Sequence, residues 1–292
     1  MSNYKIYEGN CLDILSILKE KIDLTFLDPP FNQNKEYKFH DDNLSENDYW
    51  IMMSEVCKKV FTLTSKGGAI YFMQREKNTE QVLHCLRDTG WTLQNLIIWK
   101  KKTSAVPSLN KFGKHYQIIA FATKGEKPRL FNKLRISPPL PPNYKNGYEN
   151  GIFVTDVWDD IRELTSGYFA GDEAIRNNDG ERYHKQQSPV SLLLRIILSS
   201  SKIGDTILDP FAGTGTALLV ANQLQRQSIG IEIDPENVKC IKTRISKFRE
   251  SDNINKYYKE YINTENLSEL WDVGKQVDIR SNKQKIKTLF EN

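Results

Sequence analysis

The sequence predicts an α/β protein built on a mostly parallel, doubly wound sheet with one inserted irregular region. Short apolar runs alternate with segments of helical periodicity, as they do when parallel strands are joined by crossover helices. Two turn-rich peptides, Asp28–Phe31 and Asp209–Thr216, each directly follow such a run. Ligands bind in open α/β sheets where the strands end, so both peptides are candidate sites.

The first half of the chain shows the alternation clearly. Strands are expected at 22–27, 69–73 and 93–99, and helices at 11–19, 45–62 and 76–89, the last of these ended by Gly90. The alternation of strands and helices ends after Trp99, and only 117–122 is predicted to be a further strand of the sheet. The proline-rich run 137–143 excludes regular helix or central strand.

Regular alternation returns near Pro189. Helices are expected at 189–201, 216–224 and 235–248, with strands at 206–208 and 228–231 between them. Pro235 suits a first helical turn that Asp234 can cap. The remainder, 250–292, is polar and charged with a few aromatic anchors, and no chemistry is assigned to it.

Composition excludes several classes of protein. The 292 residues carry 41 Lys and Arg against 37 Asp and Glu, and a net charge of +4 does not by itself indicate a polyanion partner. The four cysteines and four histidines show no metal-ligand spacing, so no metal is expected. No signal-peptide core is present, and no apolar run approaches the roughly 20 residues that cross a bilayer. A reducing cytoplasmic location without membrane contact is the expectation.

The peptide Asp28-Pro29-Pro30-Phe31 suits a flat, amino-bearing base. An exocyclic amine is a poor nucleophile because its lone pair is delocalised, and acceptors aimed at its hydrogens favour the pyramidal form that can attack. Asp28 and the carbonyl of Pro29 can supply these acceptors, while Pro30 stiffens the turn. Phe31 can stack on a base that has left the duplex.

The peptide Asp209–Thr216 suits a nucleotide-like cofactor. Gly213 and Gly215 allow a tight turn, and the following helix presents its amino end to a ligand. Glu232 ends the next strand, in the usual position for binding ribose hydroxyls. The peptide lacks the Gly-Lys-Ser/Thr ending of a P-loop, which disfavours binding of a nucleoside triphosphate.

These two peptides, together with Gly9–Asp13 and His184–Pro189, resemble the DNA amino-methyltransferases that use S-adenosylmethionine. The catalytic motif precedes the glycine motif, with a recognition region between them, which is the permuted order of the β class. The resemblance implies a Rossmann-like methyltransferase fold and a target base held by Asp28, Pro29, Pro30 and Phe31. The residues that it implies for binding the cofactor are Cys11, Leu12, Asp13, Lys185, Ser188, Asp209, Phe211, Ala212, Gly213, Thr214, Gly215, Thr216, Glu232 and Ile233. The chain departs from the family pattern at Lys185 and Ser188, which replace a proline and a lysine.

On this interpretation the chain divides into four parts. Residues 1–124 form the catalytic half of the methyltransferase domain, 125–183 the inserted target-recognition region, 184–249 the cofactor-binding half, and 250–292 a C-terminal extension. Duplex DNA is the expected partner, and the predicted DNA-binding residues are Lys100, Lys101, Lys102, Lys111, Lys114 and His115. The resemblance also implies a restriction endonuclease as a partner and a homodimer, although no surface is assigned to either.

The expected reaction is transfer of methyl to N6 of adenine. Adenine is favoured because the motif begins with Asp28, whereas family members that methylate cytosine N4 commonly carry Ser there. Methylation of cytosine C5 is disfavoured, because none of the four cysteines follows a proline. The alternatives that stay open are an N4-cytosine enzyme, an RNA or protein amino-methyltransferase, and a catalytically silent DNA-binding relative.

Overall fold

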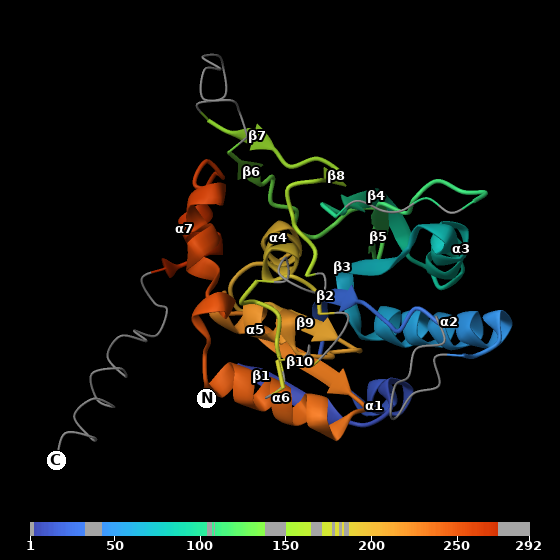
Figure 1. Cartoon of the computed structure of the whole chain (residues 1–292). Coiled ribbons are helices and arrows are strands. Elements are labelled where there is room, and N and C mark those ends of the chain that lie inside the picture. The colour runs from blue at the N-terminus through green and yellow to red at the C-terminus, as the bar shows by residue number, and fades with distance from the viewer. Residues whose placement is uncertain are drawn as a thin grey trace.

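The computed structural model shows a central eight-stranded sheet with helices on both faces (Figure 1). The strand order is β1-β10-β9-β2-β3-β5-β4-β8. The structure describes residues 3–32, 43–103, 107, 109–137, 150–164, 171–176, 179–180, 183 and 187–273. The predicted fold class, a mostly parallel doubly wound sheet, is confirmed.

The strands of the sheet are parallel except for β5, which runs antiparallel to both of its neighbours. The seven long strands are β1 (Tyr4–Glu8), β2 (Ile22–Leu27), β3 (Thr64–Arg75), β4 (Thr92–Lys100), β5 (Tyr116–Thr123), β9 (Thr206–Asp209) and β10 (Gln227–Glu232). Six of them coincide with expected strands. The strand β1 was not predicted, because it is five residues long, lies at the edge of the sheet and includes the charged Lys5 and Glu8, which leave little apolar signal.

Two layers of helices bury the two faces. The helices α1 (Cys11–Ile17), α2 (Glu46–Leu63) and α3 (Thr79–Asp88) cover one face, and α4 (Val190–Ser200), α5 (Thr216–Gln223) and α6 (Pro235–Ser246) cover the other. Alternate residues of β3 show the division, since Tyr71 packs with α4 and α5 whereas Ile70 and Phe72 pack with α2. No helix among the described residues is long and apolar enough to cross a membrane.

The inserted region contains three short strands that the sequence did not reveal. Strands β6 (Arg135–Ile136) and β7 (Ile152–Phe153) form an antiparallel ribbon, and β8 (Val157–Trp158) pairs in parallel with β4 and forms the edge of the sheet. Two-residue strands are too short to produce a hydrophobic period, which is why the pattern appeared irregular. The proline-rich run lies almost wholly outside the described residues.

The C-terminal segment is folded against the sheet domain up to Val273. It consists of η3 (Glu250–Asp252), η4 (Ile254–Tyr261) and α7 (Leu267–Leu270). A further short 3-10 turn, η1 (Glu76–Asn78), joins β3 to α3. Ile254, Tyr261 and Trp271 are buried in the same hydrophobic cluster as α4. This packing explains why α4 is apolar on nearly every side: the sheet covers one face, and η4 covers another.

Candidate active site

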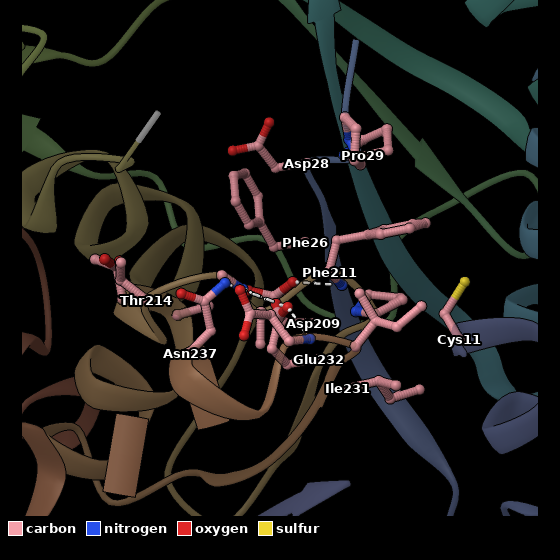
Figure 2. A pocket seen from close by; sticks show the side chains of 18 of the residues that line it. Cys11, Phe26, Asp28, Pro29, Asp209, Phe211, Thr214, Ile231, Glu232 and Asn237 are labelled. Atoms are coloured by element: carbon pink, nitrogen blue, oxygen red, sulfur yellow. Dashed lines mark hydrogen bonds between the residues drawn. The ribbon is translucent and has the colours of Figure 1, made fainter. Parts of the chain in front are cut away.

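The two motifs meet because their strands are neighbours. Strand β2 pairs in parallel with β9, with Leu24 opposite Ile207 and Thr25 opposite Leu208. Asp28 and Asp209 therefore come at the same edge of the sheet, and both line one cavity (Figure 2). The interpretation of the sequence requires the two loops to share one cleft, and the structure has this arrangement.

Polar contacts from distant elements hold the Asp28 turn. Asp28 Oδ2 accepts a hydrogen bond of 2.9 Å from Ser188 Oγ, which comes from the segment before α4. Tyr49 Oη donates to the carbonyl of Pro30 at 2.8 Å, and the same hydroxyl accepts from Gln74 Nε2 at 2.9 Å. The turn is thus fixed from α2, β3 and the start of α4 before any substrate arrives.

Aromatic rings reach the cavity from positions other than the expected one. Phe31 is 4% exposed, packs in the hydrophobic core and does not line the cavity, so its ring does not face the space in which a base was expected to stack on it. Phe26 from β2 and Phe211 from the second motif line the cavity instead, with Phe26 beside Asp28 in Figure 2. A strand residue such as Phe26 carries no motif that would have identified it.

The glycine loop is shaped by backbone that disfavours other residues. Gly213 and Gly215 have φ values of 52° and 75°, a region that residues with a Cβ rarely adopt. A Cβ on Gly215 would also lie 2.8 Å from Ile241 Cγ1, closer than side chains pack. Gly213 lines the cavity and Gly215 does not, so Gly215 sets the loop against α6 while Gly213 faces the space for a ligand.

Two buried carboxyl groups lie beside the loop. Glu232 accepts hydrogen bonds from the backbone nitrogens of Gly213 (2.7 Å) and Asp234 (2.9 Å) and from Asn237 Nδ2 (3.3 Å). Asp209 accepts one from the backbone nitrogen of Phe211 at 3.1 Å. Burial raises the pKa of both carboxyl groups, and at Asp209 the charges of Asp28 and Glu232 raise the pKa further. The ionised form of each group is therefore disfavoured in the cavity, and a cationic ligand there would favour it.

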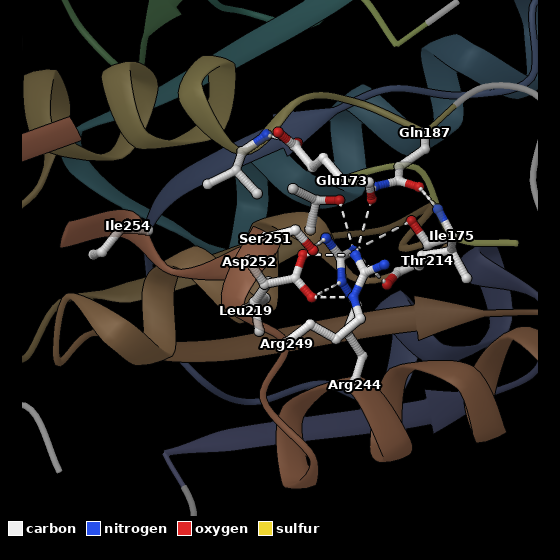
Figure 3. A network of polar contacts seen from close by, with 12 residues as sticks. Glu173, Ile175, Gln187, Thr214, Leu219, Arg244, Arg249, Ser251, Asp252 and Ile254 are labelled. Atoms are coloured by element: carbon white, nitrogen blue, oxygen red, sulfur yellow. Dashed lines mark hydrogen bonds and ion pairs between the residues drawn. The ribbon is translucent and has the colours of Figure 1, made fainter. Parts of the chain in front are cut away.

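A buried ion-pair network holds the loop from behind (Figure 3). Arg244 of α6 donates to the carbonyl of Thr214 at 3.0 Å and to Thr216 Oγ1 at 2.9 Å. Its guanidinium also pairs with Asp252, which is fully buried and pairs with Arg249 as well. Arg249 then donates to the carbonyl of Glu173 in the inserted region.

The same network reaches the catalytic side of the cavity. Gln187 donates from Nε2 to the carbonyl of Glu173 at 3.0 Å and accepts at Oε1 from the backbone nitrogen of Ile175. Gln187 lines the cavity and directly precedes Ser188, the partner of Asp28. Contacts therefore run from the glycine loop, through the C-terminal segment and the insertion, to the residue beside Asp28.

Comparison with known proteins assigns this site to a family. A family model described as DNA methylase, for N6 and N4 methylation, matches residues 22–243. The chain belongs to this family. It is similar to the type II methyltransferase M.HpaI of Haemophilus parainfluenzae, with 31% identity over 260 residues that cover 87% of this chain and 78% of that protein. It is also similar to the DNA adenine methyltransferase YhdJ of Escherichia coli K12, with 30% identity over 255 residues and 80% of each chain covered.

Solved structures of DNA methyltransferases share the fold of this DNA methylase. The cytosine-N4-specific PvuII DNA methyltransferase gives a TM-score of 0.62 at 20% identity, covering 91% of this chain and 94% of that one. The complex of M1.HpyAVI with S-adenosylmethionine gives 0.59 at 21% identity, covering 83% and 98%. At these identities the likeness shows the fold alone, and it confirms the Rossmann-like methyltransferase architecture.

Most of the predicted cofactor residues that the structure describes line the cavity of this DNA methylase, and three of them do not. Leu12 and Asp13 lie on the first turn of α1 outside the lining, where Asn10 caps the helix by accepting from the backbone nitrogen of Leu12. Gly215 packs against α6, and Lys185 lies outside the described residues. The residues in the lining are Cys11, Ser188, Asp209, Phe211, Ala212, Gly213, Thr214, Thr216, Glu232 and Ile233, joined by Asp28, Pro29 and Pro30.

The lining also includes residues that motif reasoning missed. Asn10, Gln187 and Asn237 supply amide groups, and Met52 supplies an apolar surface from α2. Asn10 and Gln187 lie inside quoted motifs, so proximity to those motifs was a usable signal. Met52 and Asn237 lie on helices with no motif nearby, and only the folded chain places them at the cavity.

The predicted DNA-binding residues lie on the hairpin loop between β4 and β5, with differing exposure. Lys100, Lys102, Lys111 and Lys114 are exposed. Lys101 is half-buried, and burial lowers its pKa despite the nearby carboxylates. The Nε2 atom of His115 is buried and makes no hydrogen bond within the described part of the chain, so the histidine does not present it to a ligand at the surface.

Proposed function

We propose that this DNA methylase transfers a methyl group from S-adenosylmethionine to N6 of adenine in duplex DNA. The observation that carries the proposal is the shared cavity, in which the Asp28 turn faces the glycine loop and the acidic strand ends. The relative YhdJ, at 30% identity, is by name a DNA adenine methyltransferase, which supports the choice of adenine. The initial Asp28 of the motif supports the same choice.

The residues of the cavity fit S-adenosylmethionine. Three carboxylates, Asp28, Asp209 and Glu232, make the site acidic, which suits a cofactor that carries a sulfonium and an ammonium group. Phe211, Gly213 and Thr214, which line the cavity near the start of α5, would hold the amino-acid part of the cofactor, and Glu232 would hold its ribose. When bound, the cofactor supplies an electrophilic methyl group.

The Asp28 turn prepares the target amine. The Asp28 carboxylate and the Pro29 carbonyl accept the two amine hydrogens, so that the nitrogen lone pair becomes available for attack on the methyl carbon. Ser188 and Tyr49 keep these acceptors in place through their hydrogen bonds to Asp28 and Pro30. Asp28 then takes the proton that the nitrogen loses on methylation. No covalent intermediate with the protein is needed.

The partners are proposed from the basic loop and from the names of related proteins. Exposed lysines on the β4–β5 loop support contact with duplex DNA, and the name type II methyltransferase of M.HpaI supports a cognate restriction endonuclease. Methylation of cytosine N4 is the second candidate, because the fold resembles the cytosine-N4-specific PvuII enzyme. A homodimer, a cytoplasmic location and the domain boundaries given above stay predictions.

The test is transfer of tritiated methyl from the labelled cofactor to unmethylated duplex DNA, followed by nucleoside analysis. We expect N6-methyladenine, and no product with Asp28→Ala although that variant still binds the cofactor. Label found only in N4-methylcytosine would replace adenine by cytosine as the target. Label in RNA or protein but not in DNA would refute the proposed substrate.

A further inference from the structure

Two large apolar side chains stand in solvent on the loop between β4 and β5. Leu109 and Phe112 have relative exposures of 104% and 98%, the highest among the large hydrophobic side chains that the structure describes. Single exposed apolar residues are common on protein surfaces. Two of them three positions apart, on one loop, mark a surface that is suited to an apolar partner.

The base of this loop is fixed while its apolar residues project. The backbone nitrogen of Lys101 donates to the carbonyl of His115 at 2.8 Å, which closes the loop at the strand ends. Lys114 Nζ lies 3.1 Å from Glu76 Oε1, and Glu163 accepts from the backbone nitrogens of Lys102 and Thr103 at 2.8 and 2.9 Å. Such a base can hold a projecting side chain in a defined direction.

The loop leaves the sheet at the edge that carries the active site. Strand β5 is antiparallel to both β3 and β4, so β4 runs in the same direction as β3 and β2. The carboxyl end of β4 at Lys100 therefore lies on the same edge as the end of β2 before Asp28 (Figure 1). Three strand spacings separate these two strand ends, which is roughly 14 Å.

The surroundings of the two apolar residues are basic. Lys102 and Lys111 on the loop and Lys100 at the end of β4 are exposed and suit the phosphates of DNA. Phosphates make no favourable contact with an exposed phenyl ring. The stacked bases between the two phosphate chains offer such a ring an apolar surface. Apolar side chains that enter the base stack are a known way for proteins to stabilise distorted DNA.

We propose that Phe112 enters the base stack of duplex DNA and occupies the gap that is left when the target base turns toward Asp28. The proposal rests on the proposed function, since it needs a flipped base in a duplex. The lysines of the loop hold the flanking phosphates, and Leu109 contacts the sugar edge beside the ring. Phe112 is then a positioning residue, because it acts on the target through the neighbouring bases and touches neither the amine nor the cofactor.

The experiment compares two duplexes that contain a site methylated by the wild-type enzyme. In one the target base is paired, and in the other it faces an abasic position and is already loosened. We expect Phe112→Ala to lower kcat/KM at least tenfold on the paired duplex and less than threefold on the loosened one. Phe112→Trp should stay within threefold of wild type on both, and cofactor affinity should not change in either variant.

Ile17→Ala is the matched control, because Ile17 is also exposed, at 67%, but lies where α1 ends on the far side of the sheet before β2 begins. Its kinetics should match wild type on both duplexes. If Phe112→Ala lowered kcat/KM equally on both duplexes, the contact of the ring would not depend on base opening. If kcat/KM fell on neither duplex, the ring would have no part in the reaction. Either result would overturn the proposal. A wild-type enzyme that methylates no duplex would instead refute the proposed function.

Discussion

At the scale of single residues, the most unusual feature is the burial of acidic groups beside one another. Asp209 is 4% exposed and lies near Asp28 and Glu232, so its ionised form loses hydration and is repelled by two like charges. The folded protein without cofactor therefore holds Asp209 at a cost in stability. A cationic ligand removes that cost, which links the acidity of the cavity to its function.

Asp209→Asn should stabilise the cofactor-free protein and weaken its binding of cofactor. The folded-state pKa of Asp209 is raised, so its stability contribution is complete at low pH and is lost as pH rises through that pKa. At pH 8 the Asn side chain cannot ionise, so the loss of stability caused by the Asp209 charge is absent from the variant. The amide oxygen of Asn can still accept the hydrogen bond from the backbone nitrogen of Phe211. We expect Tm without cofactor to rise by about 2–4 °C, equivalent to about 1 kcal/mol, and cofactor affinity measured by calorimetry to fall. A lower Tm with unchanged affinity would contradict the electrostatic account.

Ser188 makes a hydrogen bond in the folded chain that the sequence did not predict. The sequence placed Ser188 among the cofactor-binding residues, and it does line the cavity, but its hydroxyl donates to Asp28. Ser188→Ala should lower kcat about tenfold, because a lost hydrogen bond to a charged group costs about 1.5–3 kcal/mol, and should leave cofactor affinity near wild type. Steady-state kinetics with calorimetry would separate the two roles. A variant that loses cofactor affinity but keeps kcat would restore the original assignment.

At the scale of elements, the glycine loop depends on a segment that carries no motif. Arg244 supports Thr214 and Thr216 only while Asp252 of η3 orients its guanidinium. Burial alone would raise the pKa of Asp252, but hydrogen bonds from Arg249 and Arg244 outweigh it and the pKa is lowered. This group therefore stabilises the fold above its unfolded-state pKa, and that stability is lost as pH falls through the folded-state pKa.

Asp252→Asn should affect both stability and cofactor binding. The change leaves two arginines without their carboxylate, which typically costs about 3–5 kcal/mol for a buried pair, and it frees the backbone of the loop. Asp160→Asn is the control, because it also removes the carboxylate partner of a buried arginine, Arg195, but does not touch the loop. Both variants should lower Tm, and only Asp252→Asn should weaken cofactor binding about tenfold. Equal affinities in the two variants would limit the network to a structural role.

At the scale of the whole molecule, the C-terminal segment completes the hydrophobic core. Trp271 is 1% exposed, packs edge-on against Tyr258 and belongs to the cluster that contains α4 and α5. The same segment supplies Asp252 to the network behind the glycine loop. Stability and cofactor binding are thus coupled through residues outside the part of the chain that the family model matches.

Trp271→Ala should destabilise the protein by about 3–5 kcal/mol, the usual cost of removing a large buried aromatic side chain. The measurement is unfolding in denaturant, with Ile262→Ala as the control, since Ile262 lies in the same segment but is 58% exposed. The control should change stability by less than about 0.5 kcal/mol. A loss below about 1 kcal/mol for Trp271→Ala would mean that the segment is dispensable for the fold.

The class of fold, six of the seven long strands and the two motifs could be predicted from the sequence, because they depend on local periodicity and on residues next to one another in the chain. Which groups meet in space could not. The fold brings Ser188 to Asp28 across 160 positions, turns Phe31 into the core, places Met52 and Asn237 at the cavity and sets the C-terminal segment behind the glycine loop. Such contacts depend on how strands are ordered in the sheet and how helices pack on it, and neither leaves a local pattern in the chain.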